Sequence, residues 1–253
     1  MRPPPRGPVS RIRRIAFFAW TTFVAAAFGI GFFGLIVLFI GWFEKRQGVA
    51  GPMTDLGHGA LAGLIITVGL LAQLHAPERK IAGVQQAVMA LITLVIISLI
   101  GADFDDDLVL EPIFLAAVGL IVVLHPAREE FFQRGAGMSR ALLTIAALGA
   151  IPLIAYAVSM VMQAGVVVGP PHYADRLRVM ATMAIAILLT ALLAACRTHG
   201  WRISAWSAGM ASVVFGLASI LFPDDPGSAG RGWGVLAVAG GFLFIVLAER
   251  EAR

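Results

Sequence analysis

Apolar residues form eight long runs along this chain, and short polar segments separate them. Each run is near or above the ~20 residues that an α-helix needs to cross the hydrocarbon layer of a membrane. Backbone groups in lipid must be satisfied within the protein, so we expect these runs to be helices. The predicted fold is an all-α, polytopic integral membrane helical bundle of about eight transmembrane helices. The predicted spans are 15–43, 54–75, 82–101, 107–125, 141–164, 177–196, 203–222 and 232–248.

The basic residues between the spans predict the orientation. In membrane proteins, Lys and Arg residues are more frequent in cytoplasmic loops than in outer loops. If the N-terminus of this chain is inside, 14 of its 19 Lys and Arg residues lie on the inner side. The outer segments then hold the remaining five, which are Lys45, Arg46, Arg176, Arg178 and Arg231. We therefore expect both termini to be cytoplasmic and the protein to lie in the plasma membrane.

Composition agrees with this assignment. The chain is 59% hydrophobic and 13% charged, with a mean hydropathy of +0.88. In soluble domains, about 45–50% of the residues are apolar and ~25% are charged. We expect a basic cytoplasmic tail over residues 1–14 and one transmembrane domain over 15–250. The pI near 10 comes from arginines that flank the spans, so membrane lipid is the expected partner and nucleic acid is not.

Glu111 is the most unusual residue for a membrane span. It precedes His125 by 14 residues, or about 21 Å of helix, which puts it below the outer edge of the hydrocarbon layer if His125 is at the inner boundary. An ionisable group at that depth indicates a proton or cation site. Alternatively, Glu111 lies in the headgroup layer at a helix N-terminus, where the helix dipole stabilises its charge.

Two acid and imidazole pairs lie on the predicted outer side. Asp55 and His58 are three residues apart, and His172 and Asp175 repeat this spacing in reverse order. Together the four side chains could bind a divalent metal ion if their helix ends meet. Alternatively, each Asp stabilises the start of its own helix. With Glu111, these residues form the predicted proton or substrate site.

Other polar motifs have structural interpretations. His75 and His125 end two parallel spans, where helix termination is favoured over haem ligation. The acidic run at 103–107 is interpreted as a solvated turn. No catalytic residue and no cofactor is predicted. Small residues at four-residue steps allow close helix packing, within the chain or with other membrane proteins; they are Gly59, Gly63, Ser204, Ala208, Ser212 and Gly216.

Three functions remain open on the sequence. The first is a small transporter or channel-like protein with an outward-facing site at Glu111 and His58. The second is an accessory or scaffold subunit that presents small-residue helix faces to partner helices. The third is a membrane enzyme whose outer His and Asp residues hold a metal ion near a lipid-linked substrate. Catalysis is the least expected, because no nucleophile with an adjacent base is evident.

Overall fold

The computed structural model describes residues 11–43, 51–101, 110–133, 135, 137–166 and 172–253. Within these ranges the regular elements are all helices, and no strand is found. Seven helical segments are long and apolar enough to cross a membrane, and Leu110–Leu124 is a shorter apolar helix. The predicted all-helical fold is confirmed at this level. The acidic run at 103–107 and most of the predicted tail lie outside the described residues, and Arg11 to Arg14 already belong to the first helix.

The helices follow the predicted spans closely. The α-helices are α1 (Arg11–Ala26), α2 (Gly34–Ile40), α3 (Pro52–Gly59), α4 (Val68–Leu71), α5 (Ile81–Gly101), α6 (Leu110–Leu124), α7 (Arg140–Val166), α8 (Tyr173–Ala195), α9 (Trp201–Leu221) and α10 (Gly230–Glu251). Among the described residues there are also two π-helices, η1 (Ala27–Gly31) and η3 (Ala60–Thr67), and four 3-10 turns, η2 (Gly41–Phe43), η4 (Ala72–Leu74), η5 (Pro77–Arg79) and η7 (Arg128–Glu130).

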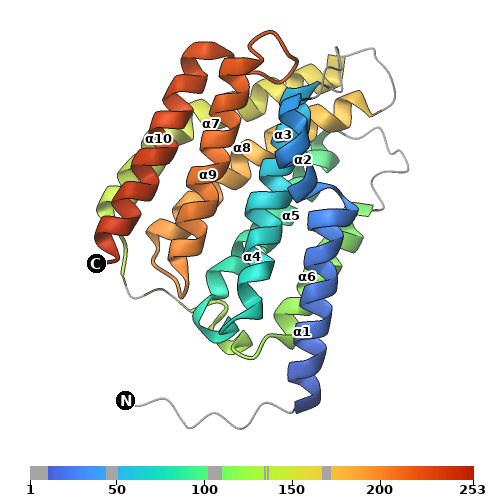
Figure 1. Ribbon diagram of the computed structural model, residues 1–253, viewed down its shortest axis with the longest axis vertical. Helices are drawn as coiled ribbons and strands as arrows, with labels where there is room; N and C mark the ends of the chain where they lie inside the picture. Colours follow the sequence, from blue (N-terminus) through green and yellow to red (C-terminus); the bar gives the residue numbers. More distant parts are fainter. Residues whose placement is uncertain (1–10, 44–50, 102–109, 134, 136, 167–171) are drawn as a thin grey trace.

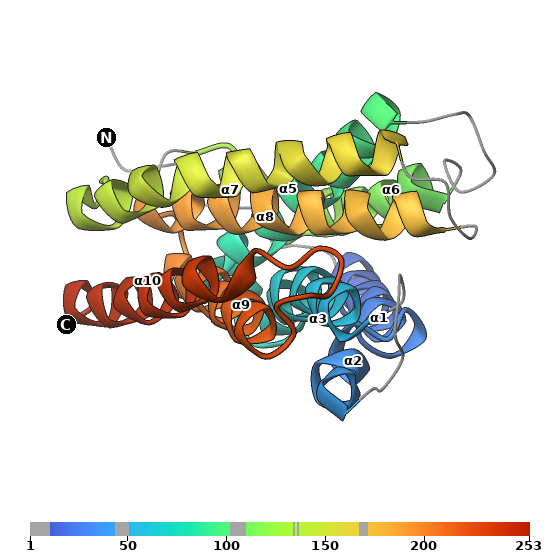
Figure 2. The ribbon, with the colours of Figure 1, turned by 90° about the horizontal axis from the view of Figure 1, so that it is seen from above.

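The long helices run along the long axis of the molecule (Figure 1). We call the end that holds Arg11 and Glu251 the terminal end, and the end that holds Phe43 and Val166 the distal end. Seen from above, α7 and α8 lie on one side, and α9, α10, α3 and α1 lie on the other (Figure 2). The main core cluster contains residues from α1, η3, α5, α8 and α9, so these segments pack as one body.

The first span is not one continuous helix, which corrects the prediction for 15–43. The chain leaves α1 through η1, and Phe33 then takes a left-handed conformation with φ of 59° before α2 begins. The break lies where the first two spans approach closely. A Cβ on Gly34 would be 2.9 Å from the Ala62 carbonyl carbon, and one on Gly63 would be 2.6 Å from the Gly34 oxygen. Only glycine allows backbones to approach this closely.

The α9–α10 hairpin is also built on glycine. Gly209 faces Gly241 and Gly216 faces Gly234, each about two helical turns apart along its helix. A Cβ on any of the four would lie 2.5 to 2.9 Å from the backbone oxygen of its partner. The predicted close packing of small residues therefore occurs within this chain. Association of such faces with other membrane proteins stays a prediction.

Buried polar groups at the terminal end join α1, η4 and α6. The Arg13 guanidinium donates to the carbonyls of Val123, Leu124 and His125, at 3.3, 3.2 and 2.6 Å. It thereby satisfies carbonyls that the end of α6 leaves without helical partners. The His125 ring is buried, and its two nitrogens contact the Ala127 N–H and the Gln73 side chain. This network holds the end of α6 in place. It agrees with the interpretation of His125 as a residue at which a helix ends.

Candidate functional site

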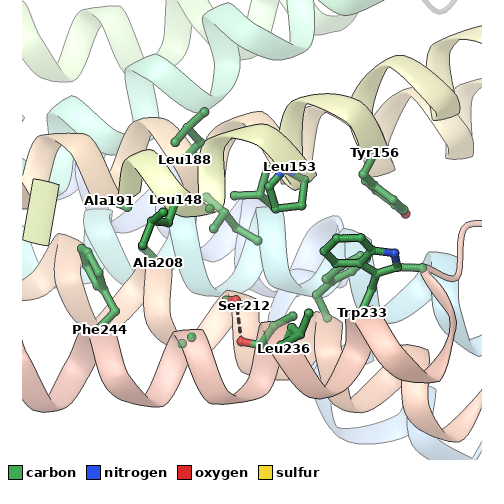
Figure 3. Close-up of a pocket in the computed structure, with 18 of the residues that line it drawn as sticks. Leu148, Leu153, Tyr156, Leu188, Ala191, Ala208, Ser212, Trp233, Leu236 and Phe244 are labelled. Atoms are coloured by element: carbon green, nitrogen blue, oxygen red, sulfur yellow. Dashed lines mark hydrogen bonds between the residues drawn. The ribbon is translucent and has the colours of Figure 1, made fainter. Parts of the chain in front are cut away.

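A groove of 770 Å³ lies between the α7–α8 pair and the α9–α10 hairpin. Side chains from α7 and α10 approach one another across it, while α8 and α9 form its floor (Figure 3). Its volume is within the range of about 300–1,000 Å³ typical of small-molecule sites. Several of its residues are strongly exposed on the outer surface of the bundle, including Leu148 at 71% and Leu236 at 60%. The groove therefore opens sideways, through the apolar surface of the bundle.

The lining of the groove is uncharged. None of the described residues that line it is Asp, Glu, Lys, Arg or His. Ser212 lies near the middle of the groove and donates to the Ala237 carbonyl. The other polar side chains gather toward the distal end, where Tyr156, Ser159, Gln163, Ser228 and Trp233 lie. The opposite end is apolar and is formed by Ile145, Leu148, Leu243 and Phe244. Figure 3 shows this separation, with Tyr156 and Trp233 at one end and Phe244 at the other. The groove thus has the polarity of an amphipathic molecule.

Tyr156 is held in place at the distal end. Its hydroxyl donates to the Gly227 carbonyl in the α9–α10 turn, and its ring packs edge-on against Phe215, with centroids 5.0 Å apart. Gly227 has a φ of 83°, a conformation that glycine adopts without strain. These contacts connect α7 to the hairpin on the far side of the groove. Tyr156 therefore sets the separation of the two walls at this end.

Pro152 introduces a backbone polar group in the middle of one wall. Proline has no N–H, so it cannot donate to the carbonyl of Leu148 one turn earlier. Both residues line the groove, and α7 continues through this position. The helix thus accommodates Pro152 with this hydrogen bond missing. The Leu148 carbonyl is a candidate acceptor for a ligand hydroxyl at this depth.

Glu111 lies in the first turn of α6, where it accepts a hydrogen bond of 2.6 Å from the Ser98 hydroxyl of α5. Ser98 is buried and Glu111 is partly buried, so the pair connects the distal ends of two helices. Glu111 is thus at a helix N-terminus, and both the proton or cation site and the headgroup position stay predictions. Glu111 does not line the groove.

His58 and Asp55, both on α3, have separate partners. The Nε2 of His58 is 2.8 Å from the Phe32 carbonyl oxygen, a group released by the break between η1 and α2. Asp55 accepts a hydrogen bond of 2.7 Å from the Arg176 guanidinium at the start of α8. The two helix starts therefore meet, as a shared site requires, and they meet through an ion pair.

His172 and Asp175 form a local cluster at the start of α8. Asp175 is 2.7 Å from Arg178, and its other oxygen is 3.8 Å from the His172 imidazole. Across the part of the chain that the structure describes, no group of three or more His, Cys, Asp or Glu residues is arranged to hold a metal ion. Asp55 and Asp175 each pair with an arginine, His58 contacts a backbone carbonyl, and His172 lies near Asp175 alone among the four predicted ligands.

The sequence contained little signal for the groove. Pro152 lies within a predicted span and Trp233 at the start of one, but neither residue by itself points to a binding site. The arginines at 176 and 178 were counted for orientation, although they flank Asp175 and could have been considered as its partners. Apolar pocket residues such as Leu148 and Leu236 have no distinguishing signal, since lipid-facing and ligand-facing leucines are alike in sequence.

Comparison with protein-family models, with curated proteins and with solved structures gives no match for this chain.

Proposed function

We propose that this chain is an integral membrane protein that binds one uncharged, lipid-like molecule in the groove between α7 and α10. The ligand places its hydrogen-bonding end near Gln163 and Trp233, and its hydrocarbon part extends toward Phe244. The observation that carries the proposal is the uncharged lining, in which five of the six polar side chains gather at the distal end and Ser212 lies near the middle. A charged headgroup inside such a groove would lack a partner and would be costly to desolvate.

The dimensions favour a chain-like ligand. The groove contacts α7 from Ile145 to Gln163, about 27 Å at 1.5 Å per residue, which is close to the ~30 Å thickness of the hydrocarbon layer. An extended acyl or isoprenoid chain with one polar end matches this length and the polarity of the groove, and we favour it as the ligand.

The other hypotheses have less support. Transport through Glu111 and His58 requires both to face one water-accessible cavity, and neither lines the groove. An enzyme with an outer metal site requires its ligands to converge, whereas here Asp55 and Asp175 pair with arginines and His58 contacts a carbonyl. A scaffold requires unoccupied small-residue faces; Gly216 and Gly63 contact helices of this chain, while Gly232 and Gly240 of α10 are open. These three hypotheses stay predictions.

For location, we propose the plasma membrane, with the terminal end and both termini on the cytoplasmic side. The support is the distribution of Lys and Arg in the sequence, together with the seven apolar segments of sufficient length. The polar end of the groove then lies near the outer surface, so the proposed ligand enters from the outer half of the bilayer.

Quenching of Trp233 fluorescence tests this function. The purified protein in neutral detergent is titrated with a diacylglycerol whose chains carry bromine next to the ester groups, at the end proposed to contact Trp233, because bromine quenches a tryptophan that it contacts. The fluorescence of Trp233 is obtained as the difference in emission between the wild type and Trp233→Phe. We expect this difference to be quenched saturably, and brominated phosphatidylglycerol to act at least tenfold more weakly.

A matched pair of glycine variants locates the binding. A Cβ on Gly240 or on Gly232 meets no atom within 4 Å, but only Gly240 lines the groove. Gly240→Phe fills the groove and is expected to abolish saturable quenching, whereas Gly232→Phe should leave it unchanged. Equal quenching in the two variants, or quenching that never saturates, would contradict the proposal.

A further inference from the structure

A second hollow, of 540 Å³, lies at the terminal end of the bundle, on the α4 and η4 side of α9. Residues from three segments form it: the end of the second span, the residue after η5, and the first two turns of α9. They are Val68, Leu71, Ala72, Lys80, Arg202, Ile203 and Trp206. The lining therefore combines two cations and one indole with an apolar floor.

A close backbone contact brings the two cations together. Gly200 precedes α9 with a φ of 85°, and a Cβ at this position would be 2.6 Å from the Lys80 Cα. One residue earlier, the His199 carbonyl accepts a hydrogen bond of 2.9 Å from the Ala82 N–H. These contacts fix the start of α9 against the segment after η5. Lys80 and Arg202 consequently line one hollow, although 122 positions separate them in the sequence.

Arg202 and Trp206 are oriented by one carboxylate. Glu249 of α10 accepts hydrogen bonds from Nε and Nη2 of Arg202, at 3.2 and 2.6 Å, and from the Trp206 indole N–H, at 2.8 Å. These bonds do not use the third guanidinium nitrogen of Arg202, Nη1. The Arg202 side chain is 56% exposed, so it remains accessible to a ligand. Lys80 adds a second positive charge on a flexible stem.

We propose that this hollow binds the phosphate of an anionic phospholipid. Lys80 and Arg202 donate to the phosphate oxygens, the indole of Trp206 lies at headgroup depth, and an acyl chain follows Val68, Leu71 and Ile203 into the hydrocarbon layer. Basic hollows between transmembrane helices bind such headgroups on the cytoplasmic side of membranes. The inference rests on the proposed membrane location and is independent of the ligand in the groove between α7 and α10.

The apolar floor distinguishes a lipid from a free phosphate ion. Leu71 is 41% exposed and Trp206 is 46% exposed, so the hollow continues onto the apolar surface of the bundle. An inorganic phosphate ion would contact the two cations and leave this apolar surface uncovered. A phospholipid covers both, and the hydrocarbon contact adds to the charge interaction.

Native mass spectrometry of the detergent-solubilised protein tests the proposal. The probes are phosphatidylglycerol, phosphatidylcholine with the same chains, and inorganic phosphate. We expect one phosphatidylglycerol to be retained at an energy that removes phosphatidylcholine. Lys80→Gln should weaken its binding about fivefold, since a basic residue near an anionic surface contributes about 1 kcal/mol, and Lys80→Arg should retain it.

Three further variants test whether the positive charge must lie in the hollow or can lie anywhere at the terminal end of the molecule. Arg140→Gln removes an exposed cation at the same end but outside the hollow, and it should bind as the wild type does. Arg202→Gln removes a cation from the hollow but also leaves the Glu249 carboxylate without its Arg202 partner. The double variant Arg202→Gln/Glu249→Gln removes both charges. We expect each of these two variants to bind phosphatidylglycerol more weakly than the wild type. Equal retention of the two lipids, unchanged binding by Lys80→Gln, or displacement of the lipid by millimolar phosphate would overturn the proposal.

Discussion

At the scale of single residues, His125 shows how burial controls a titratable group. Its side chain is 1% exposed, and its Nδ1 accepts the Ala127 N–H, so the proton of the neutral ring is on Nε2, facing the Gln73 oxygen. Burial lowers the pKa of His125 from 6.5 to about 4; the Arg13 guanidinium acts in the same direction, and Glu78 opposes the shift. The folded protein therefore holds this imidazole neutral near pH 7.

This lowered pKa predicts acid sensitivity. Between pH 6.5 and pH 4 the unfolded chain binds a proton that the folded chain does not, so stability falls as pH drops through this window. His125 alone should lower the free energy of unfolding by roughly 3 kcal/mol at pH 4 relative to pH 7. In His125→Gln the amide can still reach Gln73 without titrating, so the pH dependence should be smaller. Unfolding by SDS titration at several pH values measures this pH dependence in the wild type and in His125→Gln. If the free energy of unfolding changed with pH equally in both proteins, the role of His125 would be refuted.

Asp55 shows why the identity of a residue does not define a site. An Asp and a His three residues apart are compatible with a metal site, a helix start or an ion pair. Arg176 lies 2.7 Å from Asp55, and the side chain of this Asp is 15% exposed. Because the carboxylate already has a charged partner, binding a metal ion there would require that partner to move.

At the scale of elements, the glycine contacts between α9 and α10 determine how closely the hairpin packs. Ala at 216 would place its Cβ 2.5 Å from the Gly234 oxygen, and the two backbones would have to separate. We expect Gly216→Ala to lower the free energy of unfolding by about 1–3 kcal/mol, the range for overpacked sites.

The control for this prediction is Gly232→Ala in the same hairpin. A Cβ there meets no atom within 4 Å, and Ala has the higher helix propensity, by up to ~1 kcal/mol. Unfolding of both variants by SDS titration should therefore give changes of opposite sign. Equal effects would mean that the close contact at Gly216 does not limit the packing of α9 against α10.

The break in the first span shows how local sequence and tertiary contact act together. The glycines at 29, 31 and 34 make the helix easy to interrupt, but they do not determine where it ends. The close approach of Gly34 to Ala62 and Gly63, and the contact of His58 with the Phe32 carbonyl, lie at the break itself. The break leaves the Phe32 carbonyl without a helical partner, and His58 of α3 supplies a donor 2.8 Å away.

At the scale of the whole molecule, orientation can be measured with the single cysteine of the chain. Cys196 follows α8 at the terminal end and is exposed. If that end is cytoplasmic, a membrane-impermeant maleimide should label Cys196 in inverted vesicles and leave it unlabelled in intact cells. A cysteine placed at Asp224, in the α9–α10 turn of a Cys196→Ser protein, should show the reverse. Labelling of Cys196 from outside would reverse the proposed topology.

The sequence by itself determined the helical character of the chain, the extents of seven spans to within a few residues, and the positions where close helix packing is possible. Each of these depends on local properties, namely the length of an apolar run and the spacing of small residues. The packing of Gly216 and Gly234 was predictable in kind, because a glycine on a helix face permits close approach wherever a partner helix is present.

Only the tertiary structure decided which residues meet. Asp55 pairs with Arg176, Glu111 pairs with Ser98, and Leu148 of α7 lines one groove together with Leu236 of α10. These are contacts between segments far apart in the chain, and in an apolar sequence many helix arrangements would bury similar surface. Hydrophobicity is non-directional, so it favours helices in a membrane without specifying which faces enclose a groove. That choice comes from the shapes of the helix faces and from a few specific hydrogen bonds, including the one from Tyr156 to Gly227.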